Sequence, residues 1–183
     1  MRILMMAAGV CALALLATAG HAQEAPAPPA EMKRLDFLLG SWKLDGSFSG
    51  EMTGKLTGTA TMRSVAGGHF IVRESTSHIT AEGMPDPITI EDLTIIRYDA
   101  AAKQFVLDAY DAGPGFTGTG AIDKGTFVMS FPPDPGMPPG GFRVTVKPDG
   151  KDRLTSRAEV SEDGGKTWST VLDLKYTRAP APR

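Results

Sequence analysis

Three polar side chains that fall on an apolar strand face are the first candidates for chemistry in this chain: Glu74, His78 and Asp92. Glu74 and His78 share the even parity of Phe70 and Val72, and Asp92 shares the parity of the isoleucines around it. Since side chains alternate between the two faces of a strand, this parity predicts all three on an inward face. Buried carboxylates are costly unless they are paired, protonated or bound by a ligand. The pattern therefore indicates the polar contacts of a small-molecule site, although a water-filled rim or a different assignment of faces would also produce it.

The same residues would also suit an enzyme, in which Glu74 or Asp92 acts as the general acid or base of an isomerisation or hydrolysis. The sequence has no G-x-S-x-G elbow, and its single cysteine, Cys11, lies in the N-terminal apolar run, so no serine or cysteine nucleophile is indicated.

His69 and His78 are nine residues apart on one predicted strand and face opposite sides, so they do not form a metal site. Catalysis is left open, and no metal or other cofactor is expected.

The N-terminal segment has the order of a secretory signal peptide. A basic residue precedes an apolar run, and Gly20-His21-Ala22 follows it, which predicts a signal peptide over 1–22. The apolar run is shorter than the roughly 20 residues that cross a bilayer, so we expect no transmembrane segment. The expected location of the mature protein is the periplasm or the extracellular space.

Charge and size restrict the partners and the fold. The formal net charge is −2 and no basic run occurs, so nucleic acid is not an expected partner. The mature chain is about the size of one domain, and without disulfides it must be held by its core alone. The sequence carries no signal for an oligomeric state.

Apolar and polar residues alternate with period two over most of the chain after Gly40, while Glu31 to Leu39 has helical spacing. Turn signals such as Asp123-Lys124-Gly125 and Pro148-Asp149-Gly150 separate the alternating runs. No connection is long enough for a crossover helix, which favours a barrel or a sandwich. The predicted strands are 42–48, 55–65, 69–79, 88–98, 104–111, 116–122, 126–131, 142–147, 153–161 and 168–178.

The predicted organisation has four parts. A Pro/Ala-rich tether over 23–30 follows the signal peptide, and its composition predicts an extended, dispensable segment. The barrel domain covers 31–178, and 179–183 form a C-terminal tail.

Motifs at both ends of the domain resemble a known superfamily. Gly40-Ser41-Trp42 after a short helix is similar to the start of the calycin barrels, the lipocalins and fatty-acid-binding proteins. The resemblance implies that Trp42 closes the base of the barrel and that the late basic residue, Arg178, packs over it. The chain also resembles an exported bacterial family of unknown function. Four motifs carry this resemblance: LDFLLGSWKLDG, IIRYD, DGGKTW and YTR. The expected fold is therefore an all-β, single closed antiparallel β-barrel of eight to ten strands with a short N-terminal helix.

The segment 161–168 is similar to the Asp-box hairpins of sialidases, but it occurs once here, whereas sialidase propellers repeat it. We interpret it as a structural hairpin in which Asp163 and Thr167 cap the turn and Trp168 anchors the strand in the core. Its Gly-Gly-Lys-Thr sequence lacks the upstream glycine of a phosphate loop. The haem ligand that related small barrels place near the C-terminus has no counterpart between Lys175 and Arg178, so haem is not expected.

Calycin barrels imply binding of small apolar molecules, and this is the function that we expect. A barrel enzyme and a solidly packed envelope interaction protein are the alternatives. The acidic residues favour a neutral or cationic donor over a fatty-acid carboxylate. The predicted lining is Met62, Phe70, Val72, Phe105, Leu107, Phe127, Met129 and Phe142, with Glu74, His78 and Asp92 as polar contacts.

Overall fold

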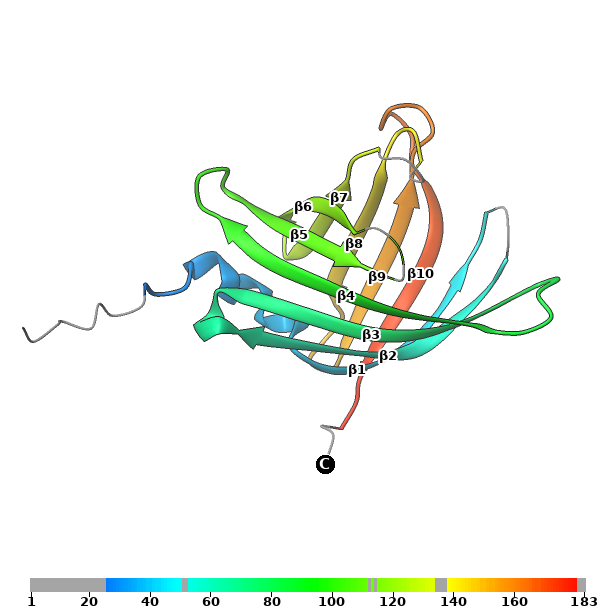
Figure 1. Cartoon of the computed structure of the whole chain (residues 1–183), viewed down its shortest axis with the longest axis horizontal. Coiled ribbons are helices and arrows are strands. Elements are labelled where there is room, and N and C mark those ends of the chain that lie inside the picture. Colours follow the sequence, from blue (N-terminus) through cyan, green and yellow to red (C-terminus); the bar gives the residue numbers. More distant parts are fainter. Residues whose placement is uncertain (1–25, 51–52, 112, 114, 134–137, 181–183) are drawn as a thin grey trace, which may run out of the picture.

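The computed structural model describes residues 26–50, 53–111, 113, 115–133 and 138–180 (Figure 1). The predicted signal peptide, 1–22, lies outside these residues. One 3-10 helix, η1 (Ala30–Leu38), precedes the strands, and a short 3-10 turn, η2 (Ala66–Gly68), follows the second strand. The strands are β1 (Gly40–Phe48), β2 (Gly54–Val65), β3 (Phe70–Ala81), β4 (Ile88–Asp99), β5 (Gln104–Tyr110), β6 (Phe116–Asp123), β7 (Thr126–Phe131), β8 (Phe142–Pro148), β9 (Arg153–Val160) and β10 (Ser169–Arg178).

The ten strands form one closed antiparallel barrel, which confirms the predicted fold class. Each strand pairs with its neighbours in the sequence, and β1 closes the barrel by pairing with β10. Tight turns with glycine at positive φ, among them Gly125 and Gly150, join consecutive strands. In Figure 1 the β1–β2 and β3–β4 hairpins extend at the end of the barrel opposite to η1. Among the described residues, no helix is long and apolar enough to span a membrane.

Helix η1 closes one end of the barrel. Its apolar residues Met32, Leu35 and Leu38 are all buried and belong to the barrel core. The indole Nε1–H of Trp42 donates a hydrogen bond of 2.8 Å to the Leu38 carbonyl oxygen and ties the helix to β1. A single short helix is marginal in isolation, so this packing is what holds it.

The seam between β1 and β10 brings Trp42 and Arg178 together. They are partners in the strand register, and the guanidinium carbon lies 4.3 Å from the centroid of the indole ring. Nη1 of Arg178 also donates to the Leu39 carbonyl oxygen at 3.1 Å, and Nε pairs with Asp152 at 3.1 Å. Trp42 is 1% exposed and meets Tyr176 edge to face. The first strand, the last strand and the end of η1 are therefore joined around one indole.

Trp168 does not anchor a strand in the core, contrary to the sequence-based expectation. A β-bulge between Thr170 and Leu172 shifts the β9–β10 register by one residue, so the side chains before the bulge change face. Trp168 lies on the outer surface, with the guanidinium carbon of Arg143 4.2 Å from its ring centroid. Its indole Nε1–H donates to the Gly165 carbonyl oxygen.

The described part of the predicted tether, residues 26–30, contacts the barrel. The Nε2–H of His69 donates to the Pro26 carbonyl oxygen at 2.8 Å, and Pro28 lies beside Gly68. Ala30 already belongs to η1. Residues 23–25 lie outside the described residues. The described part of the tether thus runs over the β2–β3 turn, and its expected dispensability stays a prediction.

Candidate ligand-binding cavity

A cavity of about 340 Å³ lies inside the barrel. Side chains from η1 and from all ten strands line it, and most of them are aliphatic or aromatic. Leu38 of η1 belongs to this lining, and so do Ile90 and Tyr110, which are 36% and 46% exposed. The cavity therefore reaches from the core to the surface near the N-terminal part of β4. Its volume lies at the lower end of the range of about 300–1,000 Å³ for small-molecule pockets.

The register between β2 and β3 decides which residues face this cavity. Val65 pairs with Phe70 and Met62 with Arg73, so even positions on β2 stand beside odd positions on β3. Met62 and Ala60 point inward, and the inward residues of β3 are therefore Ile71, Arg73, Ser75, Ser77 and Ile79. The predicted even-numbered face of β3 is wrong by one residue, and such a slip exchanges the two faces of a strand completely.

Four predicted site residues consequently lie on the outside. Glu74 pairs with Arg63 at 3.1 Å, and both side chains are more than half exposed. His78 is exposed, and its Nδ1 lies 3.0 Å from the Thr89 hydroxyl oxygen. Phe70 and Val72 share this outer parity and are partly buried. None of these four contributes to the cavity lining.

The other predicted residues lie inside the barrel. Phe105 and Leu107 are buried in the core, at 2% and 0% exposure, without reaching the cavity surface. The predicted residues that line the cavity are Met62, Asp92, Phe127, Met129 and Phe142.

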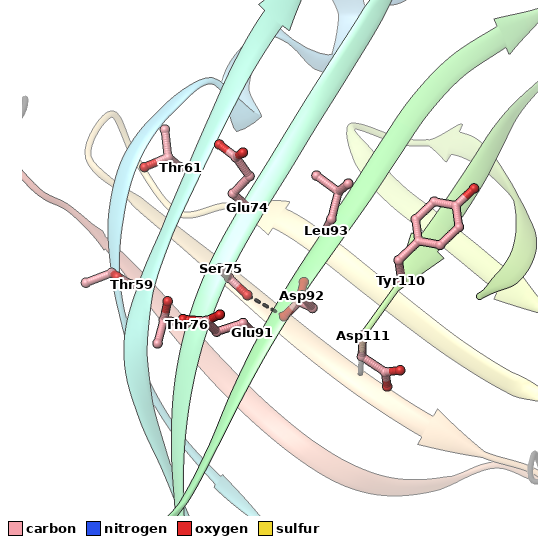
Figure 2. Close-up of a pocket in the computed structure, with 10 residues that line it drawn as sticks. All are labelled: Thr59, Thr61, Glu74, Ser75, Thr76, Glu91, Asp92, Leu93, Tyr110 and Asp111. Carbon is pink, nitrogen blue, oxygen red and sulfur yellow. Dashed lines mark hydrogen bonds between the residues drawn. The ribbon is translucent and has the colours of Figure 1, made fainter. Parts of the chain in front are cut away.

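The central polar feature of the cavity is an ion pair between Arg73 and Asp92, of which the sequence reasoning found only the acidic half. Nη1 of Arg73 donates to Oδ1 of Asp92. The Ser75 hydroxyl donates to Oδ2 of the same carboxylate, as the dashed line in Figure 2 shows. The Arg73 and Asp92 side chains are only 20% and 25% exposed. The sequence signal that could have revealed this ion pair is the presence of opposite charges on the inward faces of two adjacent strands. That signal can be recognised only when the register of the strands is assigned correctly.

The surroundings keep the Arg73 guanidinium charged. Burial alone would lower the pKa of Arg73, but the adjacent Tyr176 and Asp92 together outweigh that effect and raise the pKa above its ordinary value. Because an arginine in this state does not release its proton at any physiological pH, it can hold and orient a ligand but cannot act as a general acid.

The barrel wall opens beside this ion pair. Among the described residues, the pairing of β4 with β5 stops at Leu93 and Tyr110, whereas the pairing of β4 with β3 continues to Ile88. A second hollow of about 530 Å³ lies on the outside over β2 to β5. Figure 2 shows this hollow, with Tyr110 and Asp111 at the end of β5. Both hollows share Asp92, Tyr110 and Asp111 in their linings, so these residues stand between the interior and the solvent.

The described residues contain no cluster of three or more His, Cys, Asp or Glu side chains that could hold a metal ion. The same residues leave no buried side-chain nitrogen or oxygen without a hydrogen-bond partner.

A closed antiparallel barrel with a helix over one end, a tryptophan at its base and an internal cavity defines a calycin-like protein. The chain belongs to the family described as a protein of unknown function, DUF1579, whose model matches residues 27–178. No curated protein matches the chain.

Solved structures share the fold. The S-type phycobiliprotein lyase CpeS from Guillardia theta is 11% identical, with a TM-score of 0.58, over 83% of this chain and 94% of that one. Rv2717c from M. tuberculosis is 14% identical, with a TM-score of 0.55, over 84% of this chain and 99% of that one. At these identities, the similarity establishes the architecture and leaves the activity to be argued from the site.

Proposed function

We propose that this protein is an exported barrel that binds a small, largely apolar molecule in its interior. The observation that carries the proposal is the cavity of about 340 Å³, whose lining is mostly apolar and includes the Arg73–Asp92 pair. Many apolar walls with a few fixed polar contacts are typical of small-molecule sites. The predicted signal peptide at 1–22 supports export.

The cavity argues against a solidly packed interaction protein. The geometry also gives less support to catalysis than to binding, because Glu74 is outside and Asp92 is already held by Arg73 and Ser75. Enzymatic activity stays a second candidate on one ground, which is that a phycobiliprotein lyase has a similar fold.

The proposal predicts that filling the cavity abolishes binding. Ala158 is 3% exposed and lines the cavity, so Ala158→Leu should occupy the space that a ligand needs. The measurement is displacement of the neutral apolar fluorophore N-phenylnaphthylamine, together with native mass spectrometry of protein purified from its own cells. The wild type should bind the fluorophore, and Ala158→Leu should lose at least tenfold in affinity.

Ala121→Leu is the matched control, because Ala121 lies on the exposed face of β6. This variant should bind as the wild type does. Equal binding by the wild type and Ala158→Leu would place the fluorophore outside the cavity and contradict the proposal.

A further inference from the structure

The Arg73–Asp92 pair defines what kind of polar group a ligand of this cavity can carry. We propose, on the basis of the proposed binding function, that the ligand is a neutral apolar molecule with a hydrogen-bond acceptor, such as a ketone, aldehyde or ester, which Arg73 selects. A carboxylate or an ammonium group is excluded by the same pair.

Asp92 is held by two neighbouring side chains. Its Oδ1 accepts from Arg73 and its Oδ2 accepts from Ser75. Both carboxylate oxygens are thus engaged by protein groups. A cationic ligand would have to share Asp92 with a guanidinium of the same charge, which is unfavourable in an apolar cavity.

Arg73 has more hydrogen-bond donors than its bond to Asp92 uses. A guanidinium carries five N–H donors, and the hydrogen bond to Oδ1 of Asp92 does not occupy all of them. The side chain keeps 20% of its surface accessible, and it lines the cavity. Arg73 therefore offers donors to a ligand while its charge is already balanced by Asp92.

The charges in the cavity lining disfavour a carboxylate ligand. The pair has no net charge, so a carboxylate would bring an unbalanced negative charge close to Asp92, with Asp111 also in the cavity lining. A neutral acceptor brings no charge and accepts a bond from a charged donor, which is stronger than a bond between neutral groups. This proposal differs from the sequence-based expectation of a neutral or cationic donor, because that expectation did not include Arg73.

The test is a ligand series with one apolar chain and different polar ends: decane, decanal, methyl decanoate, decanoate and decylamine. Each compound competes with N-phenylnaphthylamine for the wild-type protein. Decanal and methyl decanoate should bind roughly ten- to a hundredfold more tightly than decane, as expected for a hydrogen bond to a charged donor. Decanoate and decylamine should bind more weakly than the ester.

Asp92→Asn gives the sharpest result, because it keeps the shape of the side chain and removes the charge that balances Arg73. In this variant decanoate should bind more tightly than methyl decanoate, which inverts the order of the wild type. Thermal unfolding of each variant establishes that it is folded. The double variant Arg73→Met with Asp92→Asn removes both charges together, leaves no unpaired charge buried, and should bind all uncharged members of the series equally.

The control is Arg63→Met with Glu74→Gln, which removes an ion pair from the outer face of the neighbouring strands β2 and β3. It should leave the order of the series unchanged. A wild-type preference for decanoate, or equal binding of decane and methyl decanoate, would overturn the inference while leaving cavity binding in place. If the wild type bound neither the fluorophore nor any member of the series, the proposed function itself would fail.

Discussion

Trp42 and Trp168 are the two tryptophans of the chain, and their environments predict different energetic roles. Trp42 is 1% exposed between η1, Tyr176 and Arg178, so truncation leaves a cavity in the core. We expect Trp42→Ala to lower the free energy of unfolding by about 3–5 kcal/mol. Trp168→Ala removes a surface contact with Arg143 and should cost about 0.5–1 kcal/mol.

Denaturant titration of both variants, followed by far-ultraviolet circular dichroism, tests this difference. Similar losses for the two tryptophans would show that Trp42 does not hold the closed end of the barrel together.

Arg73 marks the limit of prediction at the scale of single residues. From the sequence it is an ordinary polar residue in an alternating strand, and it reads as solvent-facing. Its burial depends on Asp92 of the next strand, and no local pattern reports a pairing between strands. The predicted lining on β7 was easier, because Phe127 and Met129 share one face, while the other face carries Thr126, Ser130 and a single apolar residue, Val128.

At the scale of elements, the strands could be predicted well, because each connection carries residues that adopt turn conformations. The boundaries of β7 match the prediction, and those of β4 differ by one residue. The register of β3 could not be predicted, since it has apolar residues at Phe70 and Val72 on one face and at Ile71 and Ile79 on the other. With both faces partly apolar, hydrophobic burial does not discriminate between two registers that differ by one residue.

The β9–β10 connection is the element whose stability should depend most clearly on pH. Hydrogen bonds to the Asp163 carboxylate lower its pKa to about 2, and the bond from the backbone N–H of Thr167 is the main cause. The hydroxyls of Thr167 and Ser161 and the backbone N–H of Lys166 also donate to this carboxylate. A depressed pKa contributes stability above about pH 4, and that stability is lost as the pH falls through about 2. We therefore expect Asp163→Asn to lower the melting temperature at neutral pH and the difference from wild type to shrink towards pH 2.

Thermal unfolding of the two proteins between neutral pH and about pH 2 provides the measurement. Glu162→Gln is the control, because it removes the same charge at the adjacent exposed position. A difference that stayed constant across this range would mean that Asp163 acts through packing rather than through its charge.

At the scale of the whole molecule, closure of the barrel makes every strand depend on the last one. β10 pairs with β1 on one side and with β9 on the other, so its removal exposes two strand edges and opens the core. We expect a chain that ends at Trp168 to lose cooperative unfolding and fluorophore binding altogether, whereas removal of 181–183 alone should leave both unchanged. Calorimetry and fluorophore titration distinguish the outcomes, and a truncated chain with a sharp thermal transition would refute the dependence on β10.

The pairing of the first strand with the last also determines when the barrel can close during protein synthesis. Arg178 lies 139 residues after Leu39, the backbone group to which it donates a hydrogen bond. At a synthesis rate of about 5–20 residues per second, the ribosome needs roughly 7 to 28 seconds to make that stretch of chain. During this interval β1 has no partner on one edge, and Arg178 does not yet pack over the Trp42 ring. The barrel is therefore not closed around a cavity. A nascent chain therefore cannot capture a ligand in a closed barrel, and binding begins only after the last strand has left the ribosome.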